Sequence, residues 1–143
     1  MMAISLLLIS TLGHSAELQG TITIERLMDN NLLPFDEKSG GFTLPTIKGF
    51  DGGGRLIFVH IGRIKDSFQL PEPTTAIAAD SSFSLSGELK LAGVQRQQVN
   101  APAILMYVSK SMCSVCNEVT SDARKHLKKT GWAGADIVLV NVD

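Results

Sequence analysis

The sequence predicts an α/β fold whose most informative part is a βαβ unit at the C-terminal end, preceded by a β-rich N-terminal region. Residues 103–108 and 135–143 are apolar runs of the kind found in buried strands. Between them, residues 115–127 carry an apolar side chain at every fourth position, which is typical of an amphipathic helix. A strand, a helix and a second strand in this order predict two parallel strands with a right-handed crossover.

The composition is ordinary for a globular protein. The chain has 143 residues, 44% hydrophobic and 19% charged, enough for a packed core in one domain or two small ones. The formal net charge of −1 gives no global attraction to nucleic acid, so no nucleic-acid partner is expected. The glycines at 52–54 precede an apolar strand without the Lys-Ser/Thr of a phosphate-binding loop, which favours a flexible turn. No motif calls for a cofactor.

The N-terminus has the pattern of a secretory signal peptide. Residues 1–12 are apolar except for Ser5, Ser10 and Thr11, and are too short to span a bilayer, which needs about 20 apolar residues. They fit the apolar core of a signal peptide spanning residues 1–16, with cleavage after Ala16. A first strand or helix of the mature fold, or an uncleaved anchor, is the alternative. A signal peptide predicts a periplasmic or secreted protein, where disulfides persist.

Residues 17–100 are predicted to form the β-rich N-terminal region, and the sequence assigns it no role. Residues 55–62 form an apolar run bounded by glycines, which predicts a buried strand. His60 within this run is expected to be a core histidine rather than a metal ligand. Residues 83–91 alternate apolar and polar side chains around Gly87, which predicts a hairpin or two short edge strands.

Both cysteines of the chain lie where the first strand of the βαβ unit turns into its helix. Cys113 falls at the junction and Cys116 in the first helical turn, a spacing that lets their sulfurs bond. The unpaired N–H groups and the positive end of the helix dipole stabilise a thiolate at Cys113. Thiols so placed have pKa values between about 3.5 and 7.5, against about 8.5 when unperturbed. We therefore expect Cys113 to be the nucleophile and Cys116 to resolve the mixed disulfide.

Residues 101–143 resemble the first half of a thioredoxin-like domain. The matching features are an apolar strand, the Cys-x-x-Cys turn, an amphipathic helix and a strand ending in Val-Asn-Val-Asp. The resemblance implies a thiol-disulfide oxidoreductase or isomerase in which Cys113 attacks and Cys116 resolves. Its partners would be protein thiols and disulfides and an upstream redox protein. The family usually has Gly-Pro between the cysteines; Ser114-Val115 leaves the direction of electron flow open.

The second half of the family's pattern does not follow. In related proteins a cis-proline loop that binds the substrate backbone, a β-hairpin and a final helix come after the second strand, whereas this chain stops at Asp143. The thioredoxin-like fold is therefore expected to be incomplete, and the chain to be a fragment. The alternative is that the N-terminal part completes the sheet in an unusual way. None of the prolines is assigned to face the cysteines: Pro34, Pro45, Pro71, Pro73 and Pro102. The layout also resembles DsbC/DsbG-type periplasmic isomerases, which implies a homodimer formed through residues 17–100.

Other readings of the cysteine pair stay open. Structural zinc needs about four ligands, and the pair with His126 gives at most three. A purely structural disulfide would close a very small loop and stabilise little. A redox-silent binding module of the same fold, or a thioredoxin-like protein of copper or haem maturation, would share the sequence pattern. Trp132, just past the helix, is expected to pack in the core rather than to bind a partner.

Overall fold

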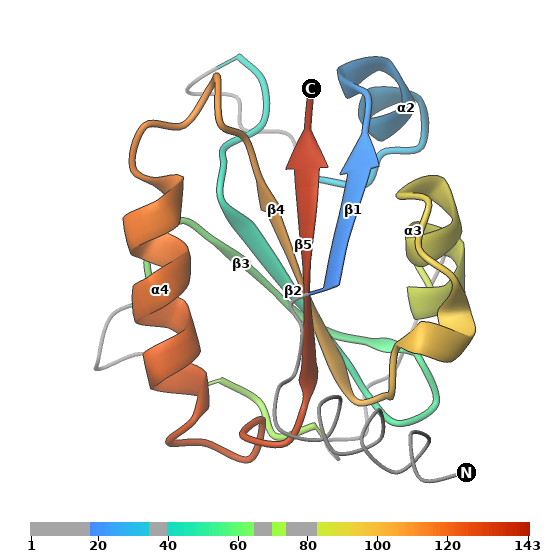
Figure 1. Cartoon of the computed structure of the whole chain (residues 1–143), viewed down its shortest axis with the longest axis vertical. Coiled ribbons are helices and arrows are strands. Elements are labelled where there is room, and N and C mark those ends of the chain that lie inside the picture. The colour runs from blue at the N-terminus through green and yellow to red at the C-terminus, as the bar shows by residue number, and fades with distance from the viewer. Residues whose placement is uncertain (1–17, 35–39, 65–69, 74–82) are drawn as a thin grey trace, which may run out of the picture.

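A single mixed β-sheet forms the centre of the computed structural model, which describes residues 18–34, 40–64, 70–73 and 83–143 (Figure 1). Its strand order is β1-β5-β4-β2-β3. Strands β1, β5 and β4 are parallel, β2 is antiparallel to β4, and β3 is antiparallel to β2. The strands are β1 (Leu18–Ile22), β2 (Thr46–Phe50), β3 (Leu56–Ile61), β4 (Ala103–Val108) and β5 (Asp136–Val142). The predicted α/β class is confirmed.

Helices lie on both faces of this sheet. Helix α4 (Cys116–Leu127) covers one face and α3 (Leu85–Leu91) the other, while the short α2 (Ile24–Asp29) stands at the end where β1 and β5 finish (Figure 1). A short 3₁₀ helix, η1 (Arg96–Gln98), leads from α3 towards β4. The predicted strand–helix–strand unit is β4–α4–β5, and its two strands are parallel as expected.

The segment predicted as a hairpin around Gly87 is helix α3 instead. Ser84 has an extended backbone and its Oγ accepts the N–H of Gly87 at 3.1 Å, which caps the first turn. Leu85 and Leu89, four residues apart, are both fully buried. The prediction counted the alternate apolar residues as a strand period, but the helical spacing of Leu85 and Leu89 together with the serine cap decides the structure.

The N-terminal region and the C-terminal unit share this one sheet. Strands β1, β2 and β3 precede residue 100, and they pair with β5 and β4, which follow it. Strand β5 lies between β1 and β4, so the last strand is not left at an open edge. The fragment was the favoured prediction, but three of the five strands of this sheet come from residues before 100, as in the alternative that the N-terminal part completes the sheet.

The core divides into two layers, one on each face of the sheet. The layer under α3 is built from side chains that include Phe50, Leu85, Leu89, Leu105, Tyr107, Val138 and Val140. The layer under α4 includes Ile47, Phe58, Ile104, Met106, Ala123, Leu127 and Trp132. The indole Nε1 of Trp132 donates to the carbonyl oxygen of Pro71 at 2.7 Å, and its ring meets Phe58 edge to face. Trp132 is therefore a packing residue, as predicted.

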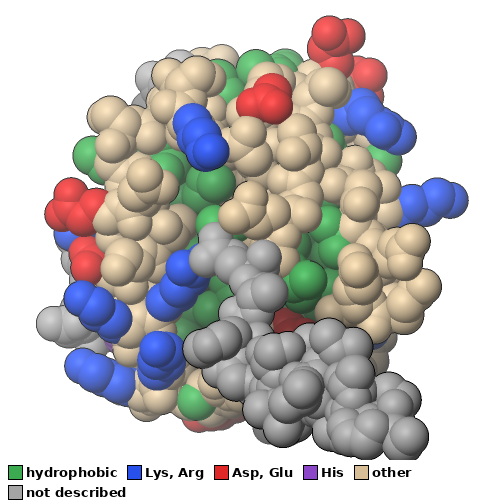
Figure 2. Space-filling view, in the orientation of Figure 1, with side chains coloured by type: hydrophobic (Ala, Val, Ile, Leu, Met, Phe, Trp, Pro, Cys, Tyr) green, Lys and Arg blue, Asp and Glu red, His purple; other side chains and the backbone are tan. Residues whose placement is uncertain are grey.

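Exposed side chains follow the polarity of α4. Figure 2 shows basic side chains gathered over its lower end, where Lys125, Lys128 and Lys129 are exposed. Glu118 lies in its first turn, so acidic and basic residues are arranged favourably for the helix dipole.

No helix in the described part of the chain is both long and apolar enough to cross a membrane. The predicted signal peptide, residues 1–16, lies outside the described residues.

Candidate disulfide site

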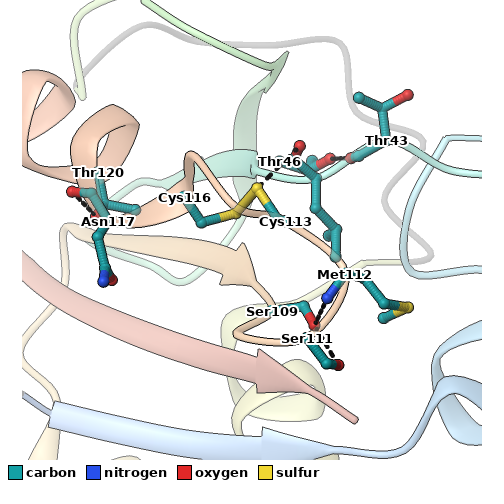
Figure 3. The surroundings of a disulfide bond; sticks show 10 residues. Thr43, Thr46, Ser109, Ser111, Met112, Cys113, Cys116, Asn117 and Thr120 are labelled. Atoms are coloured by element: carbon teal, nitrogen blue, oxygen red, sulfur yellow. Dashed lines mark hydrogen bonds between the residues drawn. A yellow bond between two sulfur atoms is a disulfide. The ribbon is translucent and has the colours of Figure 1, made fainter.

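The two cysteines form a disulfide at the point where the chain passes from β4 into α4 (Figure 3). Their Cα atoms are 5.4 Å apart, within the normal range for a disulfide. Helix α4 begins at Cys116, with Val115 as its N-cap, and Cys113 lies in the preceding turn. The prediction that the pair sits at a helix N-terminus is confirmed.

The two sulfur-bearing residues differ in exposure. Cys113 is partly exposed, whereas Cys116 is only 4% exposed. Beside them, Met112 and Val115 are each 48% exposed, although apolar side chains of this size are mostly buried in the described chain. A reagent approaching from solvent therefore meets Cys113 first, on a surface with apolar side chains close by.

The N-terminus of α4 differs from those of α2 and α3, the other α-helices in the part of the chain that the structure describes. Thr23 caps α2 and Ser84 caps α3, in each case through a hydroxyl oxygen that accepts a backbone N–H. Val115 makes no side-chain cap hydrogen bond. The positive end of the α4 dipole, with N–H groups that no capping side chain occupies, is therefore turned towards the disulfide. This is an arrangement that favours negative charge on a nearby sulfur.

The turn that carries Cys113 is anchored by a buried serine. Ser109, at the end of β4, is 1% exposed. Its Oγ accepts the backbone N–H of Met112 at 3.0 Å and lies 3.3 Å from the Oγ of Ser111 (Figure 3). Sequence reasoning did not single out Ser109, although a serine between an apolar strand and a Cys-x-x-Cys turn is a recognisable signal for a hydroxyl-bonded turn.

The segment before β2 faces Cys113 across the site. The Sγ of Cys113 lies 3.7 Å from the carbonyl oxygen of Leu44, whose peptide bond to Pro45 is cis. A disulfide sulfur carries no hydrogen, so this approach is a contact in the oxidised form. After reduction, a Cys113 thiol can donate a weak S–H···O hydrogen bond to the same oxygen.

This contact corrects the sequence analysis, which assigned no proline to the neighbourhood of the cysteines. Pro45 immediately precedes β2, and β2 pairs with β4, the strand that leads to Cys113. Because β2 and β4 are antiparallel, the start of β2 and the end of β4 meet at the same end of the sheet. The search for a proline after the cysteines missed it because Pro45 comes before them in the chain.

A buried polar cluster on the α3 face was also missed. Lys48 of β2, Glu88 of α3 and Tyr107 of β4 are 1%, 2% and 0% exposed. The Nζ of Lys48 lies 3.0 and 3.1 Å from the two carboxylate oxygens of Glu88. The hydroxyl of Tyr107 donates to Oε1 of Glu88 at 2.5 Å. The ammonium group also lies 4.4 Å from the centre of the Phe83 ring.

Burial dominates the titration of this cluster. Removal from water raises the pKa of Glu88, and the neighbouring Lys48 and the hydrogen bonds to the carboxylate oppose that rise. Burial lowers the pKa of Lys48, and the Glu88 charge opposes the fall. Burial and the Glu88 charge together raise the pKa of Tyr107. Each buried charge is compensated by the other, so removing either partner is expected to lower the stability of the folded protein.

Exposed ion pairs tie the loop after β3 to the start of α4. The guanidinium of Arg63 contacts Asp122 at 3.0 Å and Glu118 at 3.4 Å. The ring of His60 shares a hydrogen bond with the carbonyl oxygen of Arg63 at 2.9 Å. The prediction of a core histidine is wrong in placement, because β3 is an edge strand and His60 is only partly buried. All three ion-paired groups are solvent-accessible, and pairs of this kind stabilise little.

The described residues contain no group of three His, Cys, Asp or Glu side chains that could hold a metal ion. His126, the nearest candidate for a zinc ligand in the sequence, lies ten residues beyond Cys116 on α4, about 15 Å along the helix axis at about 1.5 Å per residue. The zinc reading therefore lacks a third ligand among these residues.

No protein-family model, curated protein or solved structure matches this chain. The case for its chemistry rests on the site itself: a disulfide-bonded Cys-x-x-Cys pair at a helix N-terminus, which is compatible with redox function.

Proposed function

We propose that this protein is a thioredoxin-like thiol-disulfide oxidoreductase or isomerase that acts on protein disulfides outside the cytoplasm through Cys113 and Cys116. The observation that carries the proposal is the asymmetry of the pair. Cys113 is accessible and lies before the uncapped N-terminus of α4, while Cys116 is buried behind it. A nucleophile must be reached by its substrate, and a resolving thiol must be protected from competing partners.

The proposed reaction transfers two electrons from the Cys113–Cys116 dithiol to a substrate disulfide. The Cys113 thiolate attacks one sulfur of a substrate disulfide, that S–S bond breaks, and the other substrate sulfur leaves as a thiolate that takes a proton. The Cys116 thiolate then attacks the Cys113 sulfur of the mixed disulfide, which releases the second substrate thiol and forms the Cys113–Cys116 disulfide. A dithiol redox protein must re-reduce the pair. The reverse sequence oxidises a substrate dithiol.

The surroundings of Cys113 support a polypeptide substrate. In the thioredoxin-like family, a proline loop opposite the cysteines binds the substrate backbone and is followed by a β-hairpin. Here Leu44 and Pro45 lie opposite Cys113, and the β2–β3 hairpin follows them directly. This arrangement supports the proposal, although its chain order differs from that of the family. The exposed apolar side chains of Met112 and Val115 would favour substrate segments with apolar residues beside the cysteine.

Two further parts of the proposal rest on the sequence. The signal-peptide pattern of residues 1–16 favours a periplasmic or secreted location, where the pair would meet disulfides in folding proteins. A homodimer formed through residues 17–100 would place two such sites on one molecule. Size-exclusion chromatography coupled to light scattering, run on the reduced and the oxidised protein, tests the proposed dimer. A monomer mass in both forms would refute it.

The central experiment combines alkylation and trapping. In the reduced chain, iodoacetamide at pH 6–7 is expected to label Cys113 well before Cys116, since a low pKa and exposure act on the same residue. With Cys116→Ser, a disulfide-bonded substrate protein should be trapped on Cys113, whereas the matched Cys113→Ser variant should trap none. Labelling of Cys116 first, or no reaction of either thiol below pH about 7.5, would contradict the assignment. Unchanged function of Cys113→Ser in cells would favour the redox-silent binding module.

A further inference from the structure

Among the described residues, one kind of side-chain hydrogen bond occurs in three places, and the third is unusual. In each case a hydroxyl oxygen accepts the backbone N–H three residues later. Thr23 accepts from Arg26 at 3.1 Å, and Ser84 accepts from Gly87 at 3.1 Å; these bonds begin α2 and α3. Ser109 accepts from Met112 at 3.0 Å, but α4 does not begin until Cys116. The bond at Ser109 therefore holds a turn, and the next residue after that turn is Cys113.

Apart from the disulfide, the polar contacts of Cys113 itself are longer than the bond between Ser109 and Met112. Its carbonyl oxygen accepts the N–H of Cys116 at 3.4 Å, and its Sγ lies 3.7 Å from the oxygen of Leu44. The hydroxyl of Ser109 belongs to a residue that is almost fully buried, where a hydrogen bond meets less competition from water. By fixing the N–H of Met112, it sets the direction in which the backbone enters Cys113 (Figure 3).

We propose that Ser109 is a positioning residue for the redox pair: its hydroxyl holds the turn so that the sulfur of Cys113 faces Cys116. This inference rests on the proposed function. Preorganisation of two reacting groups raises their effective concentration, so a fixed turn favours closure of the disulfide over two separate thiols. The N-cap of α4, left without a side-chain bond, stays free to stabilise the Cys113 thiolate, because the ordering hydroxyl sits at Ser109 instead of at Val115.

The test is the equilibrium of the full chain with glutathione redox buffers, comparing wild type with Ser109→Ala. Loss of one hydrogen bond of about 1 kcal/mol should lower the equilibrium constant for closing the Cys113–Cys116 disulfide about three- to tenfold. For this two-electron couple, a tenfold change is about 30 mV. Ser111→Ala, which leaves the bond from Met112 to Ser109 in place, should stay within twofold of wild type.

A matched control lies at the other end of α4. The Oγ1 of Thr130 accepts the N–H of Trp132 at 3.1 Å and donates to Leu127, so it also holds a turn. Thr130→Val should lower the melting temperature without changing the disulfide equilibrium. If Ser109→Ala stays within twofold of wild type, or if Thr130→Val shifts the equilibrium equally, Ser109 has no special role in positioning.

Hydrogen exchange gives a readout that needs no variant. The amide of Met112 should be protected in the oxidised wild-type protein even though its side chain is exposed. If the Met112 amide exchanges at the rate of an unstructured peptide, the inference is overturned. Because this measurement uses the wild-type protein, it decides the question even if Ser109→Ala does not fold. Failure of the wild-type pair to exchange with glutathione would instead refute the proposed function, while the protection of the Met112 amide would still decide whether Ser109 holds the turn.

Discussion

Removing the charge of Glu88 should destabilise the protein strongly, and the loss should depend on pH. In Glu88→Gln the side-chain volume and an acceptor for the Tyr107 hydroxyl remain, but the Lys48 ammonium is left 1% exposed without a counter-charge. Breaking a buried pair in this way costs about 3–5 kcal/mol. With a urea m-value of about 2 kcal/mol/M, the unfolding midpoint at pH 7 should fall by about 2 M.

The pH dependence follows from the direction of the Lys48 shift. Burial already lowers the pKa of Lys48, and removal of Glu88 takes away the charge that opposes this fall. Between the lowered pKa of the folded state and about 10.4 in the unfolded state, the unfolded chain binds more protons. Stability must then rise with pH in that window. The deficit of Glu88→Gln relative to wild type should therefore shrink as the pH is raised from 7 to 9.5.

A second variant separates charge from shape. Lys48→Met combined with Glu88→Gln removes both charges and leaves an acceptor for Tyr107, so its stability should return to within about 1 kcal/mol of wild type or exceed it. Asp122→Asn, which breaks the exposed pair with Arg63, should cost less than about 1 kcal/mol. Urea unfolding followed by fluorescence of Trp132, the single tryptophan, measures all three variants. A double variant as unstable as Glu88→Gln would refute the reasoning.

Two further predictions concern packing and the helix end. Gly49→Ala should cost about 1–3 kcal/mol because a Cβ there would lie 2.2 Å from the Phe58 ring, whereas Gly41→Ala, with nothing within 4 Å, should change stability by less than about 0.5 kcal/mol. Val115→Asp should cap α4 and raise the pKa of the reduced Cys113 thiol by competing for the same N–H groups, with Val115→Ala as control; an unchanged pH profile of alkylation would count against the role of the helix N-terminus.

Features set by nearby residues were predictable from the sequence. Helix α4 follows from apolar side chains four residues apart, and the position of the cysteines follows from the boundary between that pattern and the apolar run of β4. Helix α3 was missed because seven residues fit both a strand and a helical period until the Ser84 cap is included. Short elements with two competing periods are decided by their caps and their packing.

Features set by contacts between distant residues were not predictable. Lys48 and Glu88 are 40 residues apart, and no local pattern indicates that an ordinary lysine and an ordinary glutamate meet in the core. Leu44 and Cys113 are 69 residues apart and meet only because β2 pairs with β4. A sequence pattern gives the period of a strand but not its neighbour in the sheet, and both of these contacts depend on the neighbour.

The site depends on which strands are adjacent and not on the order in which the chain visits them. Strand β4 pairs with parallel β5 on one side and antiparallel β2 on the other, so its C-terminal end meets the beginning of β2. Any connection that preserves these pairings brings a Cys-x-x-Cys turn after β4 against a proline before β2. The expected order placed the proline after the cysteines, so the prediction favoured a fragment over completion of the sheet by the N-terminal part. In the structure, β2 and the Leu44–Pro45 segment come from the N-terminal side of the chain, and β2 pairs with β4 while Leu44 contacts Cys113.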